Sequence, residues 1–381
     1  MEFSFTKKQI AYQKSIIEFA KKELNGEIAD RDLQSRFSLK NWKRCSDMGY
    51  MGFLFPEEYG GIGENLATTV LCMEALSYGC SDSGLVHAIV TQACCGVQLL
   101  IYGNEDQKRR YLKPIAQGTI IAAQAMTESD AGSELTAMQA AANKLAGKYS
   151  LNGTKLYISN GPIADIVLVF AITDPQRKKF GGISCLLVEN NFDGFTSGMP
   201  LDKMGLRTLQ NSELIFNDCE VPAENLVGKE GQGMFIFNEV IEWERILMAA
   251  CHLGTMKRIY ETCVSYAKTR QQFGKAIGKF QSIANKIVEM KAAIELGKLM
   301  LYKAAWLKDQ KKRATLETSI AKLFISEKLK SLCLEAIQIH GAYGFMKEVG
   351  LERELRDSIA STIYSGTSEM QQNIISAIVG L

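Results

Sequence analysis

The sequence predicts an α+β fold in which two helical segments flank a smaller β segment. Residues 1–120 show helical periodicity with few glycines and prolines. Residues 121–230 contain short β-type runs between turns, and long helical patterns return over residues 231–381. We therefore expect an N-terminal helical domain (1–120), a middle β domain (121–230) and a C-terminal helical bundle domain (231–381).

The composition is that of a soluble globular protein. Of the 381 residues, 46% are hydrophobic and 23% are charged, which leaves ample material for a large core. The net charge of +2 gives no reason to expect a nucleic-acid partner or an anionic membrane surface. The start, MEFSFTKKQI, lacks the apolar region of a signal peptide, and no run of 18 apolar residues occurs, so we expect a cytoplasmic protein without membrane spans.

Cysteine and histidine usage argues against a metal site. The ten cysteines are scattered without a CxxC pair, and the three histidines have no metal-ligand spacing. Free, mostly buried thiols in a reducing compartment are the expected state.

The N-terminal segment predicts helices with one interrupting loop. Its helical stretches include KKQIAYQKSIIEFAKKEL and LATTVLCMEALSYG. The loop at 56–65 carries Gly60, Gly61 and Gly63, which could suggest a dinucleotide turn. Because no β-type run precedes these glycines, a simple loop is predicted instead.

The middle segment predicts strands at 168–173, 184–190 and 213–222. Turns are predicted at three dipeptides of turn-forming residues: Asn152-Gly153, Gly181-Gly182 and Asn217-Asp218.

The C-terminal segment predicts long packed helices. Apolar or small residues alternate at spacings of four and three at Ile283, Ile287, Met290, Ile294, Gly297, Leu301 and Ala304. Gly341 follows a predicted helix at 316–340, in the position that ends a helix. The stretch 274–279, GKAIGK, is one residue short of a phosphate loop and is followed by Phe280 rather than Ser or Thr. The chain also lacks the GxSxG motif of hydrolases.

One carboxylate lies on an apolar helix face. In the predicted helix at 233–254, Glu244 falls in the middle of a stripe, whereas Glu239 and Glu242 fall on the opposite, solvated side. A carboxylate on a core-facing stripe is costly unless it is paired or used, and burial raises its pKa toward that of a general base. From the residues alone, a base and a structural ion pair, with Arg245 or a distant cation, remain equal alternatives. The stripe consists of Phe237, Val240, Ile241, Leu247, Met248 and Cys251.

Five stretches together resemble the acyl-CoA dehydrogenase superfamily of flavoenzymes. They cover nearly the whole chain, in the order that the family has. The resemblance implies a helical N-terminal domain, a middle β domain and a C-terminal four-helix bundle. The stretches are AMTESDAGSE (125–134), LNGTKLYISNGPIAD (151–165), DKMGLRTLQNSELIFNDCEVP (202–222), AKTRQQFGKAIGKFQ (267–281) and QIHGAYGF…ERELRD…IYSGTSEMQ (338–371).

The resemblance implies FAD as cofactor, since a flavin needs donors at its ring edge and fixed contacts along its pyrophosphate and adenine. Ser159 is the implied donor near flavin N5, and a neighbouring subunit is implied to hold the adenine end, which makes a homotetramer the expected assembly. The implied flavin-domain contacts are Met126, Thr127, Ser133, Tyr157 and Ser159. The implied adenine and pyrophosphate contacts are Arg270, Phe273, Gln281, Gln338, Gly341 and Ala342, where Ala342 replaces a family glycine. The implied terminal contacts are Thr367 and Glu369.

The resemblance also indicates a displaced base. Many family members carry a glutamate at position 365 that removes the α-proton of an acyl thioester while a hydride leaves the β-carbon. Ser365 is too weakly basic for this step, although its backbone N–H can still donate to the thioester carbonyl. Isovaleryl-type members carry their glutamate at the position of Glu244, which makes Glu244 the predicted base. Arg245 is expected to brace the helix, with a substrate contact as its alternative role.

The runs NGPIAD (160–165) and IYSGT (363–367) resemble most the family branch that oxidises prolyl groups on carrier proteins, in prodigiosin, pyoluteorin and anatoxin type pathways. This implies an L-prolyl thioester on a phosphopantetheine arm, with an acyl or peptidyl carrier protein as partner. One alternative is a short branched-chain acyl-CoA dehydrogenase with the same base. Another is a flavin-binding protein without dehydrogenase activity. Gln124 and Tyr157 stand where aromatic residues are usual, which leaves oxygen and a flavoprotein open as electron acceptors.

Overall fold

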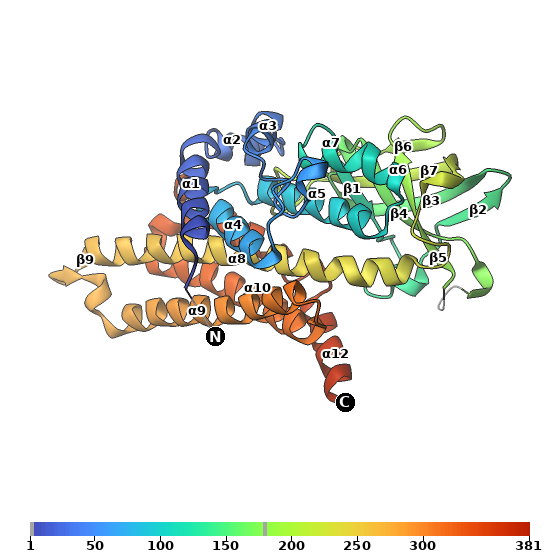
Figure 1. Cartoon of the computed structure of the whole chain (residues 1–381). Coiled ribbons are helices and arrows are strands. Elements are labelled where there is room, and N and C mark those ends of the chain that lie inside the picture. The colour runs from blue at the N-terminus through green and yellow to red at the C-terminus, as the bar shows by residue number, and fades with distance from the viewer. Residues whose placement is uncertain (1–3, 178–180) are drawn as a thin grey trace.

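The computed structural model describes residues 4–177 and 181–381. Figure 1 shows a β sheet at one end of the molecule, an N-terminal group of helices beside it, and long helices that run beneath both. The helix–β–helix order predicted from the sequence is confirmed, and so is the α+β fold class.

The N-terminal segment is helical, and its helices begin at side-chain caps. Thr6 forms a reciprocal capping box with Gln9, while Asn65 and Asp82 accept backbone N–H groups at the next two long helices. The predicted loop at 56–65 contains only the short 3₁₀ helix Glu57–Tyr59. The α-helices are α1 (Lys7–Glu23), α2 (Ile28–Leu33), α3 (Leu39–Asp47), α4 (Leu66–Gly79), α5 (Ser83–Tyr102), α6 (Glu105–Gln107) and α7 (Lys113–Ala116), with a π-helical turn at Lys108–Leu112.

Helix α5 is apolar because it lies in the core. By length and composition this one helix of the described chain could cross a membrane, but 78% of its apolar window is buried inside the protein. It packs against α8 and against the first strand of the sheet. Its hydrophobicity is therefore accounted for by packing.

The middle segment forms an eight-stranded mixed sheet in the order β6-β7-β3-β2-β4-β5-β8, with β1 parallel to β4. All seven residues of β4 are buried, as expected for a strand covered on both faces. One face of the sheet packs on the helices, and the other has a core of its own. The strands are β1 (Ala122–Ala125), β2 (Ala141–Leu145), β3 (Lys148–Ser159), β4 (Ile166–Ile172), β5 (Ile183–Glu189), β6 (Phe195–Ser197), β7 (Asn211–Pro222) and β8 (Leu226–Val227).

Two of the predicted turns are wrong. Asn152-Gly153 lies inside β3, and Asn217-Asp218 lies inside β7, directly opposite. The β3–β7 register shifts between Leu151 and Gly153, where Asp218 has φ of 48° and Gly153 has φ of 134°. The turn-forming residues thus mark a β-bulge between paired strands rather than a chain reversal.

The C-terminal segment is built on three long helices. Helix α8 has 37 residues, so it is about 55 Å long at the rise of an α-helix. It packs against α4, α5, α9 and α10, and Gly341 ends α10 with φ of 60°, as predicted. The helices are α8 (Gly233–Thr269), α9 (Gln281–Asp309), α10 (Thr315–His340), α11 (Leu351–Ala360) and α12 (Ser368–Val379), with the short strands β9 (Gln271–Gln272) and β10 (Lys275–Ala276) between α8 and α9.

Candidate active site

Glu244 lies on α8 and faces the turn that precedes α12. Its neighbours Val240, Leu247 and Met248 on the same stripe are buried. The Ser365 hydroxyl donates a hydrogen bond to Glu244 Oε1 at 2.5 Å. Positions 244 and 365, which the resemblance gives as alternative places for a carboxylate base, therefore meet at one point.

Burial raises the pKa of the Glu244 carboxyl above its ordinary value. The hydrogen bond from Ser365 and the positive charges of Arg245 and Lys322 oppose this effect, but desolvation is the larger cause. By accessible surface the residue is half-buried, while protein atoms enclose its carboxyl group. A carboxylate that is desolvated and hydrogen-bonded only by a hydroxyl is a stronger base than an ordinary glutamate.

The structural ion-pair alternative for Glu244 finds no partner among the described residues, where no ion pair includes this carboxylate. Its neighbour Arg245 is instead directed to the turn, where Nε donates to the Ser365 carbonyl at 2.9 Å. The buried Lys322 amine lies near enough to influence both residues but forms no hydrogen bond within the described chain.

The prediction that Glu242 lies on a solvated face is wrong. Its side chain is 12% exposed, and it forms an ion pair with Lys308 at 3.1 Å. Thr315 also donates to Glu242, because α10 begins where the sequence pattern placed solvent.

The Ser365–Gly366 turn is held by its carbonyl groups. Ser365 has φ of 56° and Gly366 has φ of 86°, so the chain reverses through two left-handed residues. Gln371 Nε2 donates to the Ser365 carbonyl at 3.3 Å and to the Gly366 carbonyl at 3.0 Å. The backbone N–H of Ser365 has no partner within the described chain, which leaves a fixed donor beside the Glu244 carboxyl.

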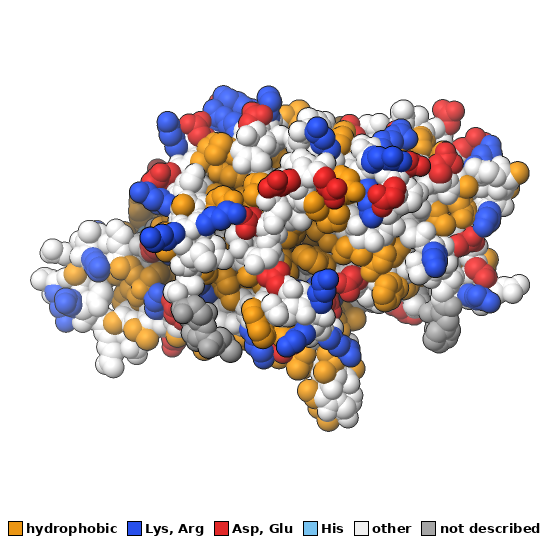
Figure 2. All heavy atoms as spheres, in the orientation of Figure 1, with side chains coloured by type: hydrophobic (Ala, Val, Ile, Leu, Met, Phe, Trp, Pro, Cys, Tyr) orange, Lys and Arg blue, Asp and Glu red, His pale blue; other side chains and the backbone are white. Residues whose placement is uncertain are grey.

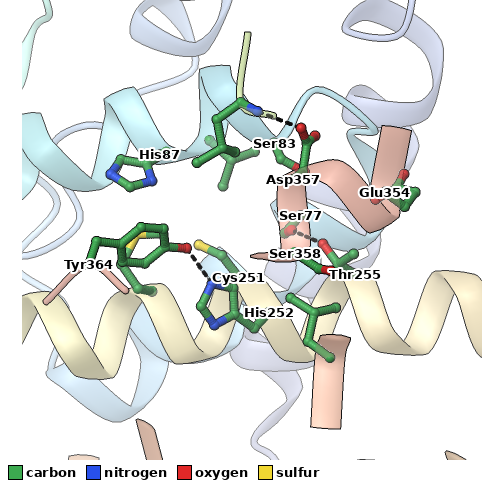
Figure 3. A pocket seen from close by; sticks show the side chains of 14 residues that line it. Ser77, Ser83, His87, Cys251, His252, Thr255, Glu354, Asp357, Ser358 and Tyr364 are labelled. Atoms are coloured by element: carbon green, nitrogen blue, oxygen red, sulfur yellow. Dashed lines mark hydrogen bonds between the residues drawn. The ribbon is translucent and has the colours of Figure 1, made fainter. Parts of the chain in front are cut away.

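A pocket opens beside this turn, one helical turn beyond Glu244 along α8. Met248 and Cys251 form part of its wall, and Tyr364 forms another part. Figure 3 shows the Tyr364 hydroxyl directed at His252 and the His87 ring above the Tyr364 ring. The His252–Tyr364 hydrogen bond is 2.6 Å long, and the rings of His87 and Tyr364 meet edge to face with centroids 4.8 Å apart.

The structure brings together the predicted cofactor residues of the β domain. The backbone N–H of Leu156 donates to the Thr127 carbonyl at 2.8 Å, so the segment after β1 lies against β3. Tyr157 has φ of 61° and is 64% exposed, which presents its ring outward. Ser159 accepts a hydrogen bond from Asn211, and its own hydroxyl proton has no acceptor within the described chain. Met126 is buried at the base of this group. Ser133 is exposed in the loop that follows.

A second group of predicted cofactor residues lies at the far end of α8. Arg270, Gln338, Gly341 and Ala342 line one open hollow. Phe273 is 92% exposed at the tip of the β9–β10 hairpin. Gln281 begins α9 and is exposed. Figure 1 shows this hairpin at the opposite end of the molecule from the sheet.

The third group lies at the start of α12. Thr367 caps this helix by accepting the Met370 N–H, and Glu369 is half a turn further on. Hydrogen bonding to its own backbone N–H and to Thr367 lowers the pKa of Glu369.

These residues fit a flavin dinucleotide. Ser159 offers a free hydroxyl donor beside the exposed Tyr157 ring, and the Gln124 Oε1 on β1 is buried without a partner among the described residues. Arg270 forms no ion pair within the described chain, so its charge is available to an anionic group in the hollow. No cluster of His, Cys, Asp or Glu suited to a metal ion occurs in the described residues.

Sequence reasoning missed several residues of the site. His87, His252 and Tyr364 were not predicted, and neither were Gln371 and Lys322. A signal existed for His87, because a histidine within the apolar α5 sequence is unusual enough to mark a polar feature of the core.

Family models match the chain almost throughout. The N-terminal domain of acyl-CoA dehydrogenase matches residues 6–119, its middle domain residues 123–219 and its C-terminal domain residues 231–380. An L-prolyl-peptidyl-carrier-protein dehydrogenase from a Serratia species is 38% identical over 100% of this chain and 99% of its own. A short-chain-specific acyl-CoA dehydrogenase from Clostridium acetobutylicum is 36% identical over 99% of both.

Solved structures give the same result. The prolyl acyl carrier protein oxidase AnaB has a TM-score of 0.98 at 44% identity, covering 99% of this chain and 100% of its own. PigA, solved with FAD and proline, has a TM-score of 0.97 at 37% identity over 100% of both chains.

Proposed function

Because the chain belongs to the acyl-CoA dehydrogenase family, we propose that it is a FAD-dependent dehydrogenase that oxidises an L-prolyl thioester carried on an acyl or peptidyl carrier protein. The enzyme acts in the cytoplasm in secondary-metabolite biosynthesis.

The observation that carries this proposal is the meeting of Glu244 with Ser365. It supplies a desolvated carboxylate on α8 and leaves position 365 without an acid. The turn keeps its backbone donor, so a thioester carbonyl can be held there while Glu244 faces the α-carbon. The identity of 44% to the prolyl carrier protein oxidase AnaB, against 35% to a butyryl-CoA dehydrogenase from Megasphaera elsdenii, favours the prolyl substrate.

The residues of this chain account for removal of the substrate α-proton. Glu244 removes the α-proton of the thioester, and the Ser365 N–H donates to the carbonyl oxygen as negative charge develops on it. Arg245 and Gln371 fix the turn through the Ser365 carbonyl, which keeps this N–H in position. The hydride and its two electrons leave the β-carbon, so the product is a 2,3-dehydroprolyl thioester.

FAD, when bound, supplies the acceptor for this hydride. The residues that would hold its ring are Met126, Thr127, Tyr157 and Ser159. Lys155 holds the segment that contains Met126 and Thr127 in place, since its buried amine donates to the Met126 carbonyl at 3.0 Å and to Glu128 at 2.7 Å.

We further propose a homotetramer in which the hollow near Arg270 completes the cofactor site of a neighbouring copy. The length of α8 separates this hollow from the flavin-ring residues of the same chain. Figure 2 shows the hairpin end and α12 standing clear of the body, and Phe273, Val379 and Leu381 are exposed there. Arg270→Glu should therefore reduce the FAD content of the purified protein, whereas Lys268→Glu, two residues earlier on α8, should not.

A short branched-chain acyl-CoA dehydrogenase is the alternative function. The acyl-CoA dehydrogenases of Clostridium acetobutylicum and Bacillus subtilis, at 36% and 37% identity, are nearly as similar in sequence as the Serratia prolyl enzyme at 38%. The same base position would serve both substrates.

The test is anaerobic mixing of the FAD-loaded protein with L-prolyl carrier protein or with isovaleryl-CoA. Bleaching of the yellow flavin band by the prolyl carrier protein, with dehydroprolyl product by mass spectrometry, is expected. Bleaching by isovaleryl-CoA alone would establish the alternative function. Bleaching by neither would support a non-catalytic flavin protein.

A further inference from the structure

The pocket one helical turn beyond Glu244 has several polar side chains in its wall. Two histidines and a tyrosine line it together with Met248 and Cys251. An acyl pocket selected only for apolar groups would bury these side chains at a cost, because an unpaired buried polar atom loses its bonds to water. A side chain of this pocket that lacks a partner within the protein would therefore point to a polar substituent on the substrate.

One buried polar side chain of this pocket lacks a partner. His87 is 7% exposed, its Nδ1 is fully enclosed, and neither ring nitrogen forms a hydrogen bond within the described chain. The other buried polar groups are satisfied: His252 by Tyr364, Ser77 by Thr255, and Asp357 by the Leu206 N–H.

His87 is connected through Tyr364 and Ser365 to Glu244, the residue proposed to act on the substrate α-carbon. Its ring lies against Tyr364, which directly precedes Ser365, and Ser365 binds the base. In a prolyl thioester, the ring nitrogen is bonded to the α-carbon that Glu244 faces. A substrate ring that entered the pocket would lie against the wall formed by His87 and Tyr364 (Figure 3).

We propose that His87 accepts a hydrogen bond from the pyrrolidine N–H of the substrate and thereby selects prolyl over carbocyclic or branched acyl groups. The inference rests on the prolyl substrate proposed above.

The protonation state of His87 suits this role. Burial and the charge of Lys203 lower its pKa to about 4, so the ring is neutral at physiological pH. A neutral imidazole has one N–H donor and one acceptor nitrogen. The substrate nitrogen carries at least one N–H whether or not it is protonated, so the acceptor is matched in either state. An acyl group without nitrogen would leave His87 unpaired, and sites built around a hydrogen bond reject such analogues.

The experiment compares L-prolyl carrier protein with cyclopentanecarbonyl carrier protein, in which a CH₂ replaces the ring N–H. Flavin bleaching is followed with the FAD-loaded wild type, His87→Leu, His87→Gln and Thr91→Ala. Thr91 is the matched control because it lies one turn along α5 and its hydroxyl donates only to the His87 backbone carbonyl.

The wild type should prefer the prolyl substrate, and His87→Leu should lose about 10- to 100-fold in kcat/KM for it. The cyclopentanecarbonyl rate should stay unchanged or rise in that variant. His87→Gln keeps a hydrogen-bond acceptor and should retain an intermediate preference for the prolyl substrate. It also provides a second test if His87→Leu does not fold. Thr91→Ala should match the wild type.

An equal loss with both substrates, or no loss with either, would overturn the role of His87 while leaving the prolyl function intact. Failure of the wild type to oxidise the prolyl substrate would instead refute the proposed function, and the assignment of His87 with it.

Discussion

Replacing Glu244 by glutamine removes the proposed base with little change to its surroundings. The two side chains have nearly the same shape, and the glutamine oxygen can still accept the Ser365 hydroxyl bond. No ion pair is broken, since Glu244 forms none among the described residues. The substitution also removes a desolvated charge from the interior. We therefore expect the variant to bind FAD and to keep the thermal stability of the wild type.

The expected loss in rate follows from the absence of a substitute base. A positioned general base contributes about 10²- to 10⁴-fold, or roughly 3–5 kcal/mol of activation free energy. The upper end applies here, because carboxylates on adjacent segments are engaged: Glu242 pairs with Lys308, and Glu327 pairs with Lys330. Ser365 itself is too weakly basic to take over.

The measurement is the rate of flavin bleaching after anaerobic mixing with L-prolyl carrier protein. This rate reports the chemical step rather than reoxidation by an external acceptor. Glu239→Gln is the matched control, because Glu239 lies on the same helix, is 39% exposed and pairs with Lys308 at 2.7 Å. It should retain nearly the full rate.

If Glu244→Gln bleaches the flavin at a rate within about threefold of the wild type, Glu244 is not the base, because a reduction of that size is far smaller than the loss expected for a general base. The same conclusion would follow if Glu239→Gln were slowed as strongly, because the loss would then reflect the helix rather than the carboxylate.

Three further predictions follow from the contacts around the site. In Ser365→Ala, loss of the hydrogen bond that lowers the Glu244 pKa should move the acid limb of the bleaching-rate profile to higher pH, because a hydrogen bond to the carboxylate favours its charged form. Adding Ser365→Glu to Glu244→Gln should restore part of the bleaching rate, because both side chains reach the same point. Lys155→Met should lower FAD content and melting temperature by leaving the buried Glu128 without its cation, whereas Lys144→Met, at an exposed ion pair of the same sheet, should change neither.

The sequence predicted those parts of the site that follow from local periodicity. The position of Glu244 on a core-facing helix face was predictable because helical geometry fixes which residues share a face, and the buried neighbours Val240, Leu247 and Met248 agree. Gly341 was identifiable because a left-handed residue at a helix end favours glycine. In both cases the determining interactions lie within a few residues along the chain.

The missed features depend on contacts between distant segments. Glu242 appeared solvated from α8 alone, but α9 and α10 bring Lys308 and Thr315 to it. Asn152-Gly153 has the composition of a turn, and only its pairing opposite Asp218 converts it into a bulge. Neither partner can be identified from local pattern.

The cofactor residues illustrate the same limit at a larger scale. Resemblance to the family predicted which residues these are, yet nothing in their order along the chain shows that Tyr157 and Arg270 lie at opposite ends of one molecule. That separation comes from the uninterrupted length of α8 and gives the reason to expect a site shared between copies.

The proposed roles, with Glu244 on α8 as the base and the Ser365 turn as the carbonyl donor, would also suit a cyclic substrate. A glutamate at 365 would project from the same turn that holds the carbonyl, and it would occupy space next to the Tyr364 wall of the pocket. With serine there, the turn keeps its backbone donor and its anchors to Arg245 and Gln371, while the acid approaches from the opposite helix. In the proposed complex the volume released would lie beside the α-carbon, where a prolyl group differs from a straight acyl chain. Base position and substrate shape are thus linked through one residue, and substitutions at 365 should alter both together.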